Sequence, residues 1–151
     1  MYTREQMLEL LSVAKAAKLS FTDDFANASL DRLCEVCNGV GSESMPEKLR
    51  KALTKAYKCA QATAAIHDWR YEQSDGLPLS QKKADTEFMC NGMREVKYRH
   101  ANGGLLGWLH RLWDERKIVA AYRLLELGGE AAWCIAFRNN SLEITKNEGS
   151  I

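Results

Sequence analysis

Apolar residues recur every three or four positions along most of this 151-residue chain. The longest run of this kind contains Leu106, Leu109, Leu112, Trp113, Val119, Tyr122 and Leu125. That spacing places apolar side chains on one face of a helix, whereas a strand needs an apolar–polar alternation that no segment here maintains. The chain holds only two prolines, the residues that interrupt helices most strongly. The sequence therefore predicts an all-α fold, and its length fits a single domain.

Capping residues and breaks predict where the first helices begin and end. Thr3 and Gln6 match a capping box, which predicts a first helix that ends near Leu19. The following segments are expected to be a turn over 20–24, a short helix over 25–33, a glycine-containing loop over 38–42, and a helical pattern that starts at Pro46 and runs, with a bend, to residue 71.

The second half of the chain is expected to contain two longer helices. A loop is predicted over 74–78, and Ser80 is expected to cap a helix that ends near Tyr98. After a glycine-rich break at 102–104, the long apolar helix is expected to stop at Gly128-Gly129. Residues 131–137 are interpreted as either a last helical turn or a strand, and the polar tail from residue 138 is expected to fray.

Composition narrows the class of protein. The net charge of +1 gives no overall field that would favour nucleic acid or an anionic membrane. Neither a secretory signal nor an apolar stretch of membrane-spanning length is recognised, and the five cysteines are odd in number and dispersed. We therefore expect reduced thiols and a cytoplasmic protein. The pair Cys34-x-x-Cys37 could be half a zinc site or a redox pair, but structural thiols are the default interpretation.

One group of polar residues has the composition of a hydrolytic site. His67 and Tyr71 are four residues apart and share a helix face, while Asp68 points about 100° away. Asp85 comes from the next predicted helix. If its carboxylate accepts a hydrogen bond from one imidazole nitrogen, the other nitrogen is fixed as a base that can take a proton from water. Tyr71 can donate its hydroxyl to Asp85 and keep it ionised.

Attack of water on an ester creates an oxyanion that needs positive charge nearby. A calcium ion could supply it, because this hard cation binds carboxylate and carbonyl oxygens. The loop with Gly39 and Gly41 can turn backbone carbonyls inward, and Asp68 can complete the set. The amide of Gly39 could also face the developing charge.

These residues resemble a known signature. The pattern His67-Asp68-x-x-Tyr71, with Ala84-Asp85-x-x-Phe88 downstream and an Asn38-Gly39-x-Gly41 loop upstream, is similar to that of the phospholipase A2 superfamily. The similarity is greatest to the disulfide-poor branch of phage, bacterial and parvoviral proteins, and it covers about residues 37–133. It implies a phospholipase A2-like helical core over 34–137, extra N-terminal helices over 1–33, and a polar tail over 138–151.

The resemblance also implies roles for single residues. His67 is the general base, Asp85 its partner, and Tyr71 the support of Asp85. The carboxylate of Asp68 binds Ca²⁺ together with the backbone carbonyls of Cys37, Gly39 and Gly41. The expected function is a calcium-dependent hydrolase of phage or prophage type that acts on a phospholipid or at a membrane surface. The cysteines that flank the histidine in secreted relatives are replaced here by Thr63, Ala64 and Arg70.

Other functions stay open from the sequence. The alternative is a catalytically silent phospholipase A2-like phage protein that binds a host protein. Three tryptophans, Trp108, Trp113 and Trp133, could form a core stripe or a lipid-facing or partner surface, and residues 105–109 are the best candidate for an exposed interface. A basic stretch over 94–111 could bind nucleic acid, although a solvated helix face is the commoner explanation.

Overall fold

The computed structural model describes residues 2–37 and 47–148, and every element in these ranges is a helix. The elements are α1 (Arg4–Ala16), α2 (Asp23–Asn27), α3 (Leu30–Val36), α4 (Glu47–Ala56), a 3-10 turn η1 (Lys58–Ala60), α5 (Gln61–Glu72), α6 (Pro78–Arg99) and α7 (Gly104–Glu148). The all-α prediction is confirmed. No helix in the described ranges is both long and apolar enough to cross a membrane.

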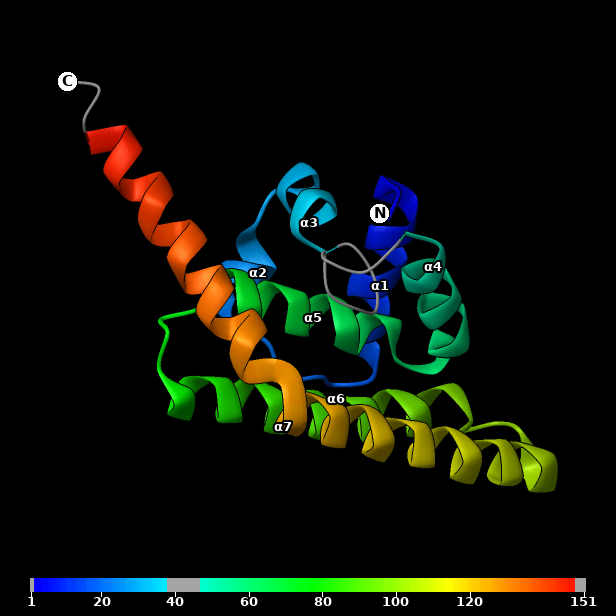
Figure 1. The fold of residues 1–151 in the computed structure, drawn as a ribbon. Helices are drawn as coiled ribbons and strands as arrows, with labels where there is room; N and C mark the ends of the chain where they lie inside the picture. Colours follow the sequence, from blue (N-terminus) through cyan, green and yellow to red (C-terminus); the bar gives the residue numbers. More distant parts are fainter. Residues whose placement is uncertain (1, 38–46, 149–151) are drawn as a thin grey trace.

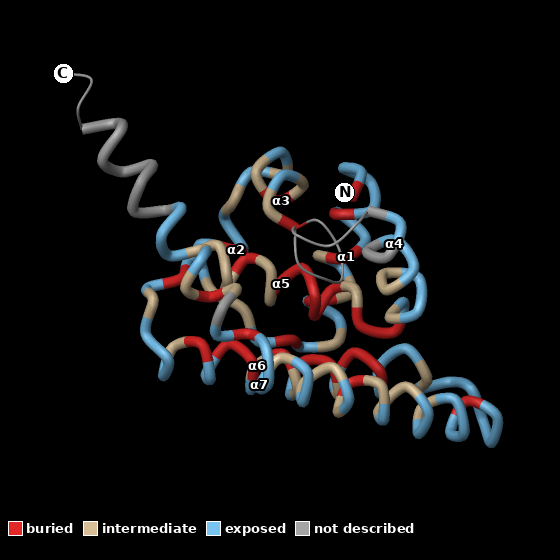
Figure 2. Tube along the Cα trace, in the orientation of Figure 1, coloured by how far each residue is buried: buried red, intermediate tan, exposed pale blue. Residues whose placement is uncertain are grey.

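Helix α5 is the centre of the fold. Figure 1 shows it between the N-terminal helices on one side and the antiparallel α6–α7 hairpin on the other. Its small residues Ala62 and Ala65 are almost inaccessible, and Ile66 and Trp69 pack with them against α1 and α3 in one apolar cluster. Figure 2 shows buried positions concentrated along this helix. A central helix with small side chains lets its neighbours approach closely on both sides.

A buried carboxylate fixes the start of α5 on α6. The side chain of Glu95 is fully buried and accepts hydrogen bonds from the backbone N–H groups of Ala62 and Thr63 and from the Thr63 hydroxyl. Arg99 donates to the same carboxylate at 2.7 Å. The first N–H groups of a helix lack partners within it and favour negative charge, so Glu95 stabilises α5 at a defined position along α6.

The two long helices pack through a small residue. A side chain added at Gly92 would place its Cβ 2.7 Å from Ile118, so only glycine allows α6 and α7 to approach this closely. Ile118 and Val96 are fully buried, and Phe88 joins them in a second apolar cluster. Beyond this contact α7 reaches the C-terminal end of α5 (Figure 1), where Trp133 packs on Tyr71.

The helix boundaries confirm some predictions and correct others. The Thr3–Gln6 capping box is present. The first helix ends at Ala16 rather than near Leu19, because Lys18 adopts φ 53° and directs the Leu19 N–H to the carbonyl of Ala14. The short helix expected over 25–33 is instead two, α2 and α3.

The start of α6 also differs from the prediction. The helix begins at Pro78, whose missing N–H is not needed in the first turn, so Ser80 lies inside the helix and does not cap it. The Ser80 hydroxyl donates instead to Asp75 at 2.6 Å. The helix ends at Arg99, within one residue of the predicted end.

The largest correction concerns Gly128-Gly129. These residues do not stop the helix: α7 continues through them to Glu148, so 131–137 are neither a separate turn nor a strand, and the tail from Arg138 is helical to that point. Figure 1 shows α7 changing direction in its orange part before its last segment leaves the body of the protein. Adjacent glycines weaken a helix and permit a bend, but packing against α5 and α6 holds this one together.

Candidate active site

His67 and Asp85 meet between α5 and α6. The Nε2 atom of His67 lies 2.9 Å from Oδ1 of Asp85, and the two side chains are 11% and 3% exposed. An ionised carboxylate only accepts hydrogen bonds, so Nε2 carries the proton and Nδ1 keeps a free electron pair. The structure therefore brings together the two residues that the sequence placed on separate helices.

Two further donors hold the carboxylate of Asp85. The Tyr71 hydroxyl donates to Oδ1 at 3.0 Å, and the Gln81 amide donates to Oδ2 at 3.2 Å. Burial and the charge of Asp85 raise the pKa of Tyr71, which therefore remains a protonated donor. Both oxygens of this buried carboxylate therefore have hydrogen-bond donors, as a buried polar group requires.

Aromatic rings fix the orientation of the imidazole. The centroid of the His67 ring lies 4.5 Å from that of Tyr71 and 5.1 Å from that of Phe88, the latter in an edge-to-face arrangement. Trp133 of α7 packs edge-to-face on Tyr71 at 5.0 Å. No other described residue forms a hydrogen bond with Nδ1 of His67. That nitrogen is therefore available as a proton acceptor.

Helix α7 covers this group through Gly129. This glycine is buried, and a Cβ added to it would lie 2.6 Å from the Tyr71 hydroxyl and 2.8 Å from the Gln81 amide nitrogen. Neither Gln81 nor Gly129 was predicted from the sequence to be part of the site. Gln81 precedes Asp85 by four residues, and this helical spacing could have revealed it. Gly129 carries no such local signal, because its role depends on packing between distant segments.

The candidate calcium residues are only partly described. Gly39 and Gly41 lie outside the described residues. Cys37 is fully buried, and its thiol donates to the carbonyl of Ala65 at 3.2 Å. Asp68 follows Ala65 by three residues, on the same side of α5. Burial, followed by the charge of Asp68, raises the pKa of the Cys37 thiol, which disfavours the thiolate that zinc would require.

A buried hydroxyl lies in the same region. Tyr2 packs in the apolar cluster with Cys37, and its hydroxyl oxygen is buried without a hydrogen-bond partner. Burial raises the pKa of Tyr2 above its ordinary value, and the charge of Asp68 acts in the same direction. A buried hydroxyl without a partner, in the cluster that contains Cys37, fits a hard cation that prefers oxygen ligands. Among the described residues, no three His, Cys, Asp or Glu side chains gather closely enough to hold a metal by themselves.

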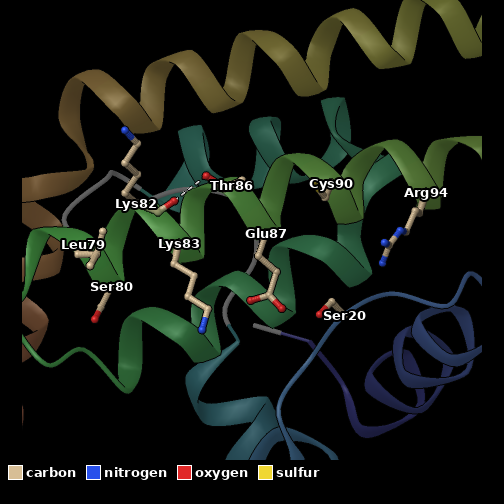
Figure 3. A pocket seen from close by; sticks show the side chains of 9 residues that line it. All are labelled: Ser20, Leu79, Ser80, Lys82, Lys83, Thr86, Glu87, Cys90 and Arg94. Atoms are coloured by element: carbon tan, nitrogen blue, oxygen red, sulfur yellow. Dashed lines mark hydrogen bonds between the residues drawn. The ribbon is translucent and has the colours of Figure 1, made fainter.

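Two other polar features lie away from His67. The rings of His100 and His110 stack with their centroids 6.3 Å apart, and His100 Nε2 lies 2.9 Å from Asp114. A groove of about 840 Å³ runs along α6 from Leu79 to Arg94 beside Ser20 (Figure 3). Neither His67 nor Asp85 lines this groove.

The fold and this site define an all-helical protein with a buried histidine–aspartate pair that is supported by a tyrosine and a glutamine. Comparison with known proteins finds no matching family model, no matching curated protein and no matching solved structure.

Proposed function

We propose that this protein is a calcium-dependent phospholipase A2-like hydrolase of phage or prophage type, which cleaves a glycerophospholipid ester with water activated by His67. The observation that supports this proposal best is the 2.9 Å contact between His67 Nε2 and the buried carboxylate of Asp85. It leaves Nδ1 as the nitrogen that can act on water. The resemblance of the His67-Asp68-x-x-Tyr71 pattern to phospholipases A2 supports the same reaction.

In the proposed reaction, Nδ1 of His67 takes a proton from a water molecule while the water oxygen attacks the ester carbonyl carbon. The imidazole becomes a cation, and the charge of Asp85 stabilises it through Nε2. The tetrahedral intermediate then collapses: the bond between the carbonyl carbon and the alcohol oxygen breaks, and Nδ1 returns its proton to that oxygen. The products are a fatty acid and a lysophospholipid, with no covalent enzyme intermediate.

Tyr71 and Gln81 act as positioning residues in this scheme. They keep the carboxylate of Asp85 aimed at His67 through bonds of 3.0 and 3.2 Å. Asp68 is the side chain that would hold the calcium ion. When bound, the ion would supply positive charge to the developing oxyanion.

The test is fatty acid release from mixed phospholipid vesicles by the purified protein with calcium. His67→Gln should abolish release. His110→Gln is the matched control, because it removes a histidine that does not contact Asp85. No release by the wild type, or equal release by His67→Gln, would reject the proposed function. In that case the silent host-binding protein would be the better hypothesis.

A further inference from the structure

The end of the α6–α7 hairpin exposes a set of large apolar side chains. Its members and their exposed fractions are Tyr98 45%, Leu105 75%, Leu106 69%, Trp108 50%, Leu109 50%, Leu112 37% and Trp113 63%. We call this set the hairpin tip. Figure 1 shows the tip extending beyond the N-terminal helices, and Figure 2 shows it as almost entirely exposed. The interpretation of these tryptophans as a core stripe is wrong for Trp108 and Trp113 and right for Trp133, which is 3% exposed.

The apolar residues of the tip point away from the body of the protein. Gly107 and Ile118 are the buried positions on this part of α7, and Ile118 packs against Gly92 of α6. Leu105, Leu109 and Leu112 follow one another at helical spacing on the opposite side. Contiguous apolar surface of this kind indicates an interaction site in a protein that otherwise buries its core well.

The charges around the tip favour an anionic partner. Residues 95–117 contain five Lys and Arg and three Asp and Glu. Each acid has a cationic partner at 2.7 Å: Glu95 pairs with Arg99, Asp114 with Lys117, and Glu115 with Arg111. Lys97 and Arg116 are exposed and form no ion pair with any described residue. The tip therefore combines exposed tryptophan and leucine with uncompensated positive charge.

We propose that the hairpin tip binds the surface of an anionic phospholipid bilayer, with its tryptophans and leucines at the level of the headgroups. Tryptophan favours this interface because its ring is apolar and its N–H is polar, and arginine and lysine are attracted to anionic lipids. A second copy of the chain is a less suitable partner, because a dimer formed through the tip would bring Lys97 and Arg116 of both copies together without compensating acids. This proposal rests on the proposed function in one respect: a phospholipid hydrolase meets a membrane surface.

Vesicle binding tests the proposal without catalysis. The full chain is mixed with phosphatidylcholine vesicles, with and without phosphatidylglycerol, in the presence of EDTA, and sedimentation and tryptophan emission are recorded. The wild type should bind the anionic vesicles with a blue shift in emission. Trp108→Ala/Trp113→Ala should bind at least about tenfold more weakly. Leu79→Ala is the matched control, since this side chain is 80% exposed but lies at the other end of α6.

A second variant tests how much the positive charges contribute to vesicle binding. Lys97→Gln/Arg116→Gln should weaken binding about tenfold on vesicles with phosphatidylglycerol and have little effect on phosphatidylcholine alone. The proposal is overturned if the wild type binds neither vesicle, or if the tryptophan variant binds as well as the wild type. A dimer that Leu109→Glu dissociates, without vesicle binding, would overturn it in favour of self-association.

Failure of this proposal and failure of the proposed function are distinguishable. His67→Gln should bind vesicles as the wild type does, because the contacts of His67 are with Asp85, Tyr71 and Phe88 and not with the tip. Vesicle binding without ester hydrolysis would count only against the proposed function. Hydrolysis of a dispersed short-chain phospholipid without vesicle binding would count only against the membrane-binding tip.

Discussion

Replacing Gly129 with alanine should lower the free energy of unfolding, whereas the same change at the neighbouring Gly128 should raise it. A Cβ at Gly129 would lie 2.6 Å from the Tyr71 hydroxyl, while a Cβ at Gly128 would meet nothing within 4 Å. An unstrained contact needs about 3.5 Å, so alanine at 129 requires a shift of roughly 0.9 Å. Tyr71 cannot make this shift freely, because Asp85 and Trp133 hold it.

The magnitude follows from two opposing effects. Alanine stabilises a helix relative to glycine by about 0.5–1 kcal/mol, and this gain applies to both positions. Overpacking at a closely packed site costs about 1–3 kcal/mol, and this cost applies only to Gly129→Ala. Because the helix term cancels in the comparison, Gly129→Ala should be less stable than Gly128→Ala by about 1–3 kcal/mol.

Urea unfolding followed by circular dichroism measures this difference from the two transition midpoints. A second step isolates the contact responsible. In a Tyr71→Phe background the hydroxyl is absent, so the cost of Gly129→Ala should shrink, and the two changes should be non-additive. Equal stability of Gly128→Ala and Gly129→Ala, or an unchanged cost in the Tyr71→Phe background, would refute the packing of α7 on the site.

Four further predictions test other parts of the structure. Asp85→Asn should keep the helical circular dichroism spectrum but lower phospholipid hydrolysis by about 10²–10⁴-fold, because the imidazole loses the partner that fixes its tautomer; unchanged activity would contradict the proposed role. Calcium should raise the thermal midpoint of the wild type reversibly with EDTA and leave that of Asp68→Asn unchanged; a shift that persists in the variant would place the ion elsewhere. Glu95→Gln should lower the free energy of unfolding by about 1–3 kcal/mol in urea titrations, since it removes the charge of a fully buried carboxylate that accepts from the first N–H groups of α5 and from the partly exposed Arg99, and an unchanged stability would speak against that role. Burial and the nearby charge of Asp114 raise the pKa of Cys59 from 9.0 to about 11, so the folded state retains this proton more tightly; stability should therefore fall between pH 9 and pH 11 by up to about 1.4 kcal/mol per pH unit, and Cys59→Ala should remove that part of the slope.

The local pattern of the sequence was sufficient to predict the helices and to identify His67 and Asp85 as the candidate pair. Helical spacing of apolar residues predicts an all-α fold because each helix must bury one face, whatever its neighbours are. The four-residue interval from His67 to Tyr71 likewise puts both on one face before any packing is known. A capping box such as that of Thr3 and Gln6 involves only neighbouring residues, and the sequence predicts it directly.

Predictions from neighbouring residues alone were wrong where the packing of distant segments, or an unusual backbone angle, determines the helix boundaries. Lys18 ends α1 with a left-handed conformation that glycine usually supplies, so nothing in the sequence marked the boundary. Gly128-Gly129 was predicted to be a helix end, yet α7 continues because tertiary contacts stabilise it. The glycine at 129 has a different reason: the site behind it leaves no room for a larger side chain.

The sequence by itself determined the helical class, the candidate residues His67, Asp85 and Tyr71, and the apolar character of the segment 105–113. Only the tertiary structure decided that Asp85 lies 2.9 Å from His67, that Gln81 and Gly129 complete its surroundings, and that Trp113 faces outward while Trp133 faces inward. The physical reason is that helical periodicity specifies which side chains share a face. The neighbour that each face meets depends on how segments far apart in the chain pack together.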